Sequence, residues 1–410
     1  MFDVLVIGGG AAGMMAAITA AEYGANTALI EKNDRLGRKL AITGKGRCNV
    51  TNDCDLETVM NNIPRNARFL YSALSAFGTE DAKAFFEGIG VPLKTERGKR
   101  VFPVSDKAGD VVKALTDRLN QLNVDIIRDE ARELIIEDGE CRGVVCKKSR
   151  RMAGSVILAS GGKSYPVTGS DGFGYTLAQQ AGHTIIPPVP SLIPLETRQR
   201  WVSRAAGLTL KNAAVRLFDG DKQVYDDFGE LLFTNYGVSG PTVLSSSAHI
   251  TEMQSGRWHL TIDLKPALSE KQLDARLLRD FAELKGKPFE EVLGGLLPQQ
   301  LRQPIAELAG IPGDKRVDEI TREERRTLIA ALKCLRLDIE RFRPIDEAIV
   351  TRGGVCVKEI SPKTMESRLC KNLFLAGEII DVDAYTGGFN LQIAFSTGRA
   401  AGLSAAGCNW

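Results

Sequence analysis

The sequence predicts an α/β protein in which one sheet-based domain is interrupted by a β-rich domain and a helical domain. Two observations support this. A short apolar run at 2–7 is followed by a glycine cluster, an alanine-rich segment and a second apolar run at 27–31, which is the order strand, helix, strand. After Pro344 the pattern returns to strands and glycines and ends in an alanine-rich helix. The middle of the chain is therefore interpreted as an insertion into one domain.

The remaining elements follow in order along the chain. Residues 55–123 are expected to be mostly helical, with a break at 92–103, and Asp138-Gly139 favours a hairpin turn. Four prolines between Pro187 and Pro194 predict a linker. Residues 195–263 alternate apolar and polar positions, as antiparallel strands do. The later strand-like runs are Val124–Ile127, Leu134–Ile136, Val156–Ala159 and Leu373–Ala376.

Residues 267–340 are predicted to be helical, and two capping boxes support this. They pair Ser269 with Gln272 and Thr321 with Glu324. The expected domains are then 1–187 with 346–410, a β domain at 188–265 with about 336–345, and a helical domain at 266–335.

Composition excludes several classes of protein. The 410 residues are 43% hydrophobic and 25% charged with a formal charge of +2, so a disordered chain or a strongly basic nucleic-acid or membrane binder is not expected. Residues 4–21 carry no charge, but four glycines interrupt them and Asp3 precedes them, which argues against a membrane span. The chain has eight cysteines, none in a Cys-x-x-Cys pair, and only three histidines, so a metal site is not expected. The cysteines are expected to be free thiols in a reducing cytoplasm.

The strongest local motif is Gly8-Gly9-Gly10-Ala11-Ala12-Gly13, a G-x-G-x-x-G between a strand and a helix. Gly8 permits a tight turn, Gly10 lets a pyrophosphate approach the backbone, and Gly13 lets helix and strand pack closely. Glu31 ends the next strand, where a carboxylate accepts ribose hydroxyls. The motif predicts a Rossmann-like dinucleotide site, the alternative being a tight turn alone.

Two further segments favour FAD over NAD. Leu373–Glu378 is a strand that ends in Gly377-Glu378, and Gly387-Gly388 then leads into a helix. A helix start of this kind would stabilise negative charge on a reduced flavin. The loop 43–52 is glycine-rich, basic and polar, as expected for contacts with phosphates and a flavin ring, although a solvated basic loop is the plainer alternative.

With these motifs in place, the chain resembles the BaiN/YhiN-like family of FAD-dependent oxidoreductases. The matching segments are Gly8–Gly13, Gly37–Asn52, Ser160–Gly174, Pro190–Leu195, Gly229–Pro241, Thr351–Val355 and Leu375–Gly398. The resemblance implies a discontinuous FAD domain of the glutathione-reductase-like fold, with non-covalent FAD. The expected cofactor contacts are Gly8, Gly10, Ala11, Ala12, Gly13, Glu31, Lys32, Arg38, Lys39, Thr43, Gly46, Arg47, Cys48, Asn49, Ala131, Ser160, Gly161, Gly162, Gly377, Glu378, Gly388, Phe389, Asn390 and Leu391.

Candidates for chemistry beyond the cofactor are few. Tyr236 and Tyr385 are candidate catalytic residues that would donate a proton or line a substrate cavity, although tyrosine at such positions is more often a packing residue. Cys48 is a candidate thiol without a partner cysteine at redox spacing. Arg352 would anchor an anionic or carbonyl substrate, or pair with a surface carboxylate.

Several functions remain open at this point. The first hypothesis is reduction of an activated C=C bond, in a substrate such as a steroid or bile acid, with NADH or NADPH recharging the flavin. A competing hypothesis is oxygen-dependent oxidation of a small amine or amino-ketone. A flavin-dependent RNA-modifying or nucleic-acid-binding protein and a non-catalytic flavin carrier are the other classes. The sequence predicts a small-molecule substrate and leaves the oligomeric state undetermined.

Overall fold

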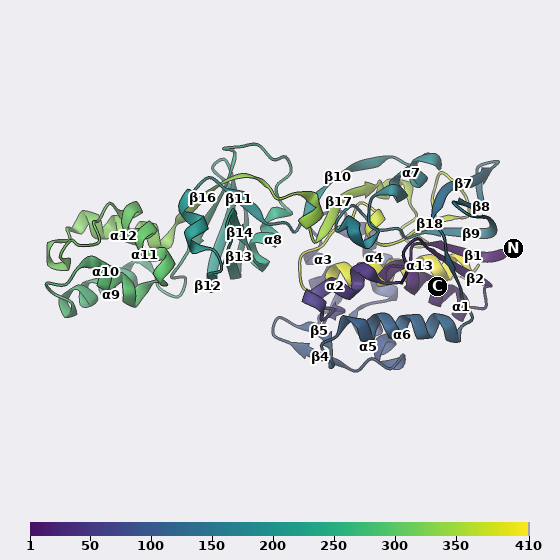
Figure 1. Cartoon of the computed structure of the whole chain (residues 1–410), viewed down its shortest axis with the longest axis horizontal. Helices are drawn as coiled ribbons and strands as arrows, with labels where there is room; N and C mark the ends of the chain where they lie inside the picture. Colours follow the sequence, from purple (N-terminus) through teal and green to yellow (C-terminus); the bar gives the residue numbers. More distant parts are fainter. Residues whose placement is uncertain (409–410) are drawn as a thin grey trace. The chain divides into compact units, whose positions relative to one another are not determined.

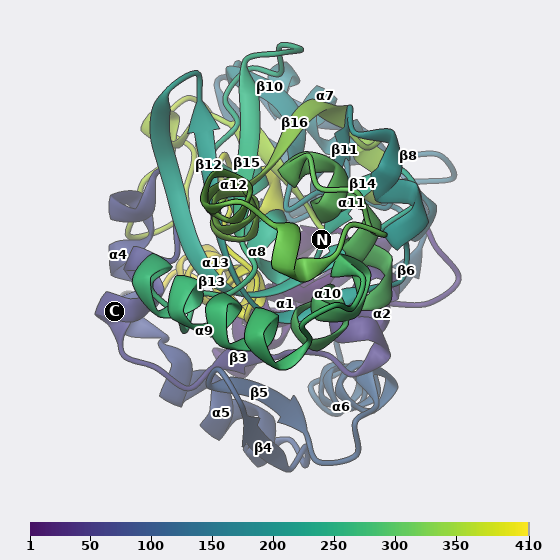
Figure 2. The same ribbon diagram turned by 90° about the vertical axis from the view of Figure 1, so that its left-hand side faces the viewer.

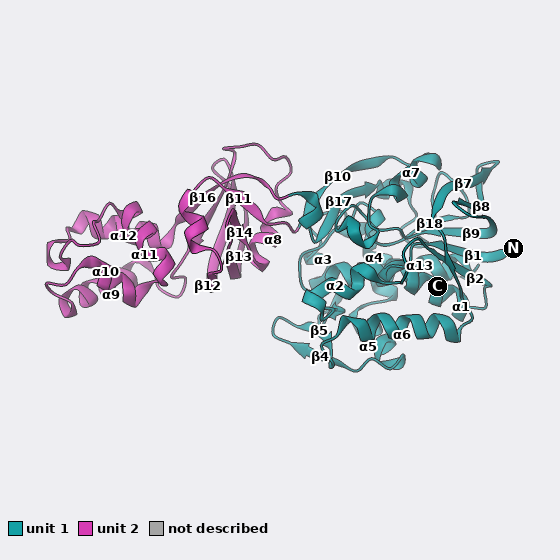
Figure 3. Cartoon of the chain, viewed as in Figure 1, with its two compact units in different colours: residues 1–191, 344–410 teal, residues 192–343 magenta. Residues whose placement is uncertain are grey.

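The computed structural model describes residues 1–408, which form two compact units. Within the described residues, unit 1 comprises 1–191 and 344–408, and unit 2 comprises 192–343 (Figure 3). Each unit has its own hydrophobic core. The expected separation of the insertion into a β domain and a helical domain remains a prediction, because unit 2 holds strands and helices together. No helix among the described residues is long and apolar enough to cross a membrane.

Unit 1 is built on a seven-stranded sheet of order β6-β2-β1-β9-β8-β7, with β18 also paired to β9. The strands β6, β2, β1, β9 and β18 are parallel, whereas β7 and β8 join the edge antiparallel. The bounds are β1 Phe2–Ile7, β2 Thr27–Glu31, β6 Asp125–Arg128, β7 Ala131–Glu137, β8 Glu140–Cys146, β9 Arg150–Leu158 and β18 Leu373–Leu375. The predicted strands and the hairpin turn at Asp138-Gly139 are confirmed.

Two helices from opposite ends of the chain pack against each other in unit 1. They are α1 (Ala11–Glu22) and α13 (Phe389–Ala405), which lie side by side in Figure 1. The contact is close because a Cβ atom on Gly398 would lie 2.4 Å from the carbonyl oxygen of Ala12, and one on Gly402 would lie 2.3 Å from that of Ala16. Glycine in α13 therefore brings the first and last elements of the chain together.

The segment between β2 and β6 is only partly helical. Its helices are α2 Arg38–Gly46, α3 Leu56–Asn61, α4 Ala67–Ala76, α5 Thr79–Gly88 and α6 Ala108–Gln121. The expected break at 92–103 is a β-hairpin, β4 (Leu93–Glu96) and β5 (Arg100–Pro103), which pairs with β3 (Thr51–Asn52) in a small sheet.

Most of the proline-rich segment that follows α7 (Phe173–Gln180) is a strand and not a linker, although the boundary between the two units falls within the segment, after Ser191. It forms β10 (Ile185–Ser191), which pairs with β17 (Val350–Val355) in a two-stranded ribbon. Each strand of such a ribbon has only one partner, so proline's missing N–H is tolerated. Register shifts between Ile186 and Val189, where two of the prolines lie.

Unit 2 contains a closed barrel of order β11-β14-β13-β12-β15-β16. The strands are β11 Leu195–Thr197, β12 Thr209–Asp219, β13 Lys222–Phe233, β14 Gly237–Ser239, β15 Trp258–Asp263 and β16 Leu335–Phe342, and the helices are α8 Pro241–Ser247, α9 Glu270–Glu283, α10 Phe289–Leu296, α11 Gln299–Ala309 and α12 Arg322–Lys333 (Figure 2). Both predicted capping boxes are confirmed, at the starts of α9 and α12. Residues 335–340 were expected to be helical but belong to β16, because their alternating apolar positions close the barrel.

Candidate functional site

The turn between β1 and α1 consists of glycines for steric reasons. Gly8 has φ +105°, and a Cβ atom there would lie 2.6 Å from the carbonyl oxygen of Ala159. A Cβ atom on Gly13 would lie 1.8 Å from the carbonyl oxygen of Gly8. Gly10 differs, because a Cβ atom there would meet no protein atom within 4 Å. Gly8 and Gly13 therefore shape the turn, whereas Gly10 leaves open space beside it.

The first turn of α1 is suited to an anion. Its N-cap, Gly10, has no side chain to accept a hydrogen bond, and the turn contains no acidic residue. Its backbone N–H groups and the positive end of the helix dipole match a pyrophosphate. Gly377 lies against this turn, since a Cβ atom there would be 2.7 Å from the Cβ of Ala12. Two of the predicted cofactor segments therefore meet at the start of α1.

The carboxylate of Glu31 lies beside the same turn. Glu31 is buried at the end of β2, with 8% of its surface exposed. Oε2 accepts a hydrogen bond from the backbone N–H of Gly9 at 2.8 Å, and Oε1 accepts one from the side-chain amide of Asn33 at 2.6 Å. Arg38 in turn donates to Oδ1 of Asn33 at 2.9 Å. These bonds fix the carboxylate where the sequence predicts contact with ribose hydroxyls.

A second glycine-led helix start comes from the C-terminal segment. Gly388, with φ +104°, precedes α13, and a Cβ atom on it would lie 2.4 Å from the carbonyl oxygen of Thr51. The side-chain amide of Asn390 holds the preceding loop, because it accepts a hydrogen bond from the N–H of Ala384 at 2.9 Å and donates one to the carbonyl of Ala384 at 2.7 Å. The first turn of α13 also lacks an acidic residue and a side-chain cap. It is therefore a second place where negative charge is favoured.

An ion pair joins the segments around these turns. Lys39 Nζ lies 2.7 Å from Oε2 of Glu378. Oε1 of Glu378 accepts hydrogen bonds from the hydroxyl of Ser164 at 2.9 Å and the backbone N–H of Thr351 at 2.8 Å. This network links α2, the loop after β9, the strand β17 and the segment after β18.

The basic loop 43–52, predicted to face the flavin, begins in the distorted end of α2 and ends in β3. Residues 43–45 depart from helical geometry, and Lys45 has φ +58°. Arg47 forms ion pairs with Glu96 and Asp106 and lies 4.2 Å over the ring of Phe102. The positive charge of Arg47 is therefore balanced by the β4–β5 hairpin and the loop that follows it.

Burial makes Cys48 a poor nucleophile. Its side chain is fully buried, and desolvation raises the pKa of the thiol to about 12. Because the thiolate is the reactive form, a catalytic role for this cysteine is disfavoured and a packing role is favoured.

Two predicted contact residues hold buried polar atoms without a hydrogen-bond partner among the described residues. They are Oδ1 of Asn49 and Oγ of Ser160. Buried polar atoms in folded proteins nearly always have a partner. Ser160 borders the glycine turn, because a Cβ atom on Gly8 would lie 2.9 Å from its Cα. These two atoms and the two uncapped helix starts fit the polar groups and phosphates of FAD.

The other predicted residues lie at varying places. Lys32 pairs with Asp171 at 2.7 Å, and Ala131 is buried at the first position of β7. The two candidate tyrosines lie in different units: the ring of Tyr236 in unit 2 lies 4.3 Å under the guanidinium of Arg343, and Tyr385 is in unit 1. Of the remaining contacts expected from sequence, Ala11 is in the first turn of α1, and Phe389 and Leu391 are in the first turn of α13. Gly46 ends α2, and Gly161 and Gly162 lie in the loop after β9.

A partly buried charge cluster was not predicted from the sequence. It brings together Arg65 in the loop between α3 and α4, Arg352 on β17, and Asp381 and Asp383 in the loop before α13. Arg65 and Asp383 are 318 positions apart and form an ion pair. Asp381 and Asp383 were visible within a motif, but no local pattern pointed to Arg65 as their partner.

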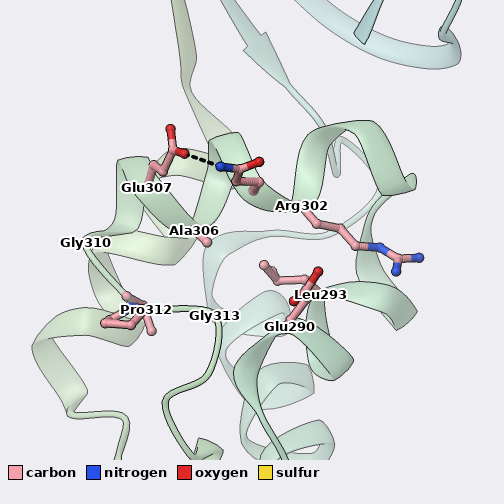
Figure 4. Close-up of a pocket in the computed structure, with 10 residues that line it drawn as sticks. Glu290, Leu293, Arg302, Ala306, Glu307, Gly310, Pro312 and Gly313 are labelled. Carbon is pink, nitrogen blue, oxygen red and sulfur yellow. Dashed lines mark hydrogen bonds between the residues drawn. The ribbon is translucent and has the colours of Figure 1, made fainter. Parts of the chain in front are cut away.

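The described residues offer no metal site, and the pocket found in unit 2 is separate from the predicted cofactor residues. The described residues contain no cluster of three or more His, Cys, Asp or Glu side chains that would hold a metal ion. A surface pocket of about 520 Å³ lies between α10 and α11 in unit 2 (Figure 4). There Gln303 donates a hydrogen bond to Glu307 at 2.8 Å. None of the predicted site residues lines this pocket.

Comparison with known proteins agrees with this geometry. The model of the family described as "HI0933-like protein Rossmann domain" matches residues 2–404. The chain belongs to this family. It is an FAD-dependent oxidoreductase with a Rossmann-like FAD-binding domain.

Two curated relatives align with nearly the whole chain. The chain is 35% identical over 98% of both sequences to the 3-dehydro-bile acid delta(4,6)-reductase of Clostridium scindens. It is 29% identical to the ribosomal RNA dihydrouridine synthase of Haemophilus influenzae, over 98% of this chain and 97% of that one. Among solved structures, a 3-ketosteroid-delta4-(5alpha)-dehydrogenase from Rhodococcus jostii RHA1 matches 99% of this chain and 96% of its own, with a TM-score of 0.50 and 17% identity, which shows the shared fold.

Proposed function

We propose that this protein reduces a carbon–carbon double bond conjugated to a carbonyl group, in an organic substrate such as a steroid or bile acid. The observation that carries the proposal is the 35% identity, over 98% of both chains, with a relative named as a reductase of 3-dehydro bile acids. A conjugated carbonyl draws electron density from the double bond, so its far carbon accepts hydride. When bound and reduced, FAD would supply that hydride through its N5 atom, and a tyrosine or water would give the proton to the carbon next to the carbonyl group.

The residues of unit 1 have distinct tasks in this proposal. The first turn of α1 holds the pyrophosphate, and Glu31 holds the ribose. The start of α13 provides N–H groups and a positive dipole end for negative charge on the cofactor. The Lys39–Glu378 pair keeps α2, β17 and the segment after β18 in place around it.

NADH or NADPH is the proposed source of electrons. The sequence contains no second G-x-G-x-x-G fingerprint that would mark a separate nicotinamide domain. The nicotinamide cofactor is therefore expected to bind transiently near the flavin and to donate its hydride there.

Anaerobic mixing of the purified holoenzyme tests the proposal in two halves. NADH or NADPH should bleach the flavin, and testosterone, whose ketone is conjugated to a double bond, should restore its colour. Dihydrotestosterone is the matched control, because it keeps the ketone and lacks the double bond. If conjugated ketones of several sizes leave the reduced flavin bleached, whichever reductant was used, the proposal is wrong.

A second candidate substrate is a uracil base in RNA, favoured by the relative named as a ribosomal RNA dihydrouridine synthase. The pyrimidine double bond of uridine is also conjugated to a carbonyl, so the same reaction class applies. Reoxidation of the reduced flavin by a ribosomal RNA transcript, and not by testosterone, would favour this candidate. The near-neutral charge of the chain argues against strong non-specific binding to RNA.

A further inference from the structure

Arg352 is a buried cation of unit 1 and is not one of the predicted cofactor contacts. It lies on β17 with 7% of its surface exposed. Arginine is almost never this buried unless it meets opposite charge. Its electrostatic neighbours are Arg65, Asp383 and Asp381, so the cluster holds two cations and two carboxylates.

Both carboxylates in the cluster already accept hydrogen bonds from other groups. Asp383 has an exposed fraction of 1% and accepts from Arg65 and, at 2.7 Å, from the hydroxyl of Ser191. Asp381 accepts from the amide of Asn66 at 3.0 Å and from the backbone N–H of Gly353 at 3.1 Å. Arg65, Ser191, Asn66 and Gly353 therefore donate to these carboxylates in addition to the positive charge that Arg352 brings to them.

The backbone around Arg352 is rigidly held. Gly353 and Gly354 have φ +88° and +129°, and Cβ atoms on them would lie 2.4 Å from the carbonyl oxygens of Pro187 and Ile379, respectively. Only glycine fits both positions. This double glycine fixes the direction of the strand after Arg352.

The same strand is tied to the segment that carries the predicted cofactor contacts. On one side of Arg352, the N–H of Thr351 donates to Glu378; on the other side, the N–H of Gly353 donates to Asp381. Residues 377–383 begin at Gly377, which lies against the first turn of α1, and lead toward the glycines that precede α13. Arg352 is thus held by backbone contacts next to the cofactor loop.

Burial also shifts the pKa values of Arg352 and Asp381. Desolvation lowers the pKa of Arg352 to about 10, and repulsion from Arg65 adds to this effect. Desolvation raises the pKa of Asp381, while Arg65 lowers it in part. Such an environment strengthens hydrogen bonds from the guanidinium, because little water competes for them.

We propose that Arg352 binds the carbonyl oxygen of the substrate. A guanidinium has five N–H donors in a rigid fork, so it holds a carboxylate and a carbonyl oxygen at once. Its positive charge stabilises the negative charge that collects on that oxygen when hydride adds to the conjugated double bond. This inference rests on the proposed reduction of a conjugated ketone and assigns the residue that recognises the ketone.

Binding to the oxidised holoenzyme tests the inference without turnover. Testosterone is titrated into the wild type and into R352Q and R352K, and the shift of the flavin absorbance gives each dissociation constant. Loss of a hydrogen bond from a charged group should weaken binding by about 10- to 100-fold in R352Q, and R352K should fall between R352Q and the wild type. R118Q is the control, because Arg118 pairs with Glu22 on the α6–α1 surface of the same unit.

A second readout separates substrate recognition from general damage. Dithionite-reduced enzyme is reoxidised either by testosterone or by ferricyanide, which has no carbonyl. In R352Q the ratio of the two rates should fall at least tenfold, whereas damage to the flavin site would slow both reactions together. If R352Q loses FAD, the same two measurements on R352K decide the matter.

The inference is overturned if the wild type binds testosterone and the Arg352 variants bind it with unchanged affinity and an unchanged rate ratio. In that case Arg352 only balances the aspartates. A wild type that neither binds nor is reoxidised by any conjugated ketone would instead overturn the proposed function, and with it this assignment.

Discussion

The glycine turn separates folding from cofactor binding, and Gly10→Ala tests that separation. Gly10 has φ −82° and ψ −170°, an extended conformation that alanine adopts freely, and a Cβ atom there meets no protein atom within 4 Å. The only folding penalty is the poorer N-cap, which costs about 1 kcal/mol or less. The stability of the cofactor-free protein should therefore change little.

The effect on FAD should be larger. The methyl group enters the space beside the turn, where backbone N–H groups must come within about 2.9 Å of phosphate oxygens. Inserting a methyl group into a closely packed contact costs about 1–3 kcal/mol, which corresponds to about 5- to 150-fold weaker binding. The structure thus predicts a variant that folds normally and binds FAD poorly.

Two measurements check this prediction on protein freed of its flavin. Thermal unfolding without FAD reports stability, and quenching of FAD fluorescence on titration reports affinity. Gly109→Ala is the matched control, because Gly109 lies in α6 with φ outside the left-handed region and its Cβ would also meet no atom within 4 Å. Wild-type FAD affinity in Gly10→Ala would show that the pyrophosphate does not lie over this turn and would refute the cofactor placement.

Three other predictions follow from the same geometry. Gly13→Ala should lower the unfolding free energy by at least about 3 kcal/mol, seen as a large drop in melting temperature without FAD, because its Cβ would lie 1.8 Å from a backbone oxygen. The native protein at pH 8 should be alkylated by iodoacetamide at the exposed Cys334 and not at the buried Cys48, whose pKa is about 12, as read by mass spectrometry. Burial lowers the pKa of His183, so this side chain takes up a proton more readily in the unfolded chain than in the folded protein as the pH falls below about 6.5. The urea concentration at the unfolding midpoint should therefore decrease when the pH is lowered from 7.5 to 5.5. The decrease should be smaller in His183→Gln.

The part of the site that sequence predicts is the part encoded locally. The turn from Gly8 to Gly13 and the carboxylate of Glu31 fall within one strand–helix–strand unit, so spacing alone places them. The start of α13 was predicted for the same reason, from Gly387-Gly388 before an alanine-rich segment. The structure adds that Gly398 and Gly402 within α13 pack this helix against α1.

The features that sequence did not predict depend on long-range contacts. The hairpin β4–β5 looked like a break between helices, because its strands are only four residues long and pair mainly with each other. Arg47 was expected to face phosphates, yet the hairpin and its following loop supply it with two carboxylates. The charge cluster joins three separate segments, and no local spacing relates Arg65 to Asp383.

The position of the insertion explains why unit 1 keeps an intact cofactor scaffold. The chain leaves unit 1 after Ser191 and returns at Pro344, and Ser191 pairs with Val350 across the β10–β17 ribbon. Because the insertion begins and ends beside one two-stranded ribbon, it can be accommodated without a change in the sheet that carries the glycine turns. Arg352 lies on that ribbon, and Asp383 holds its last residue, Ser191. The inferred carbonyl-binding residue is therefore placed by the cofactor loop itself, so recognition of the ketone and binding of FAD depend on the same short segment, 377–383.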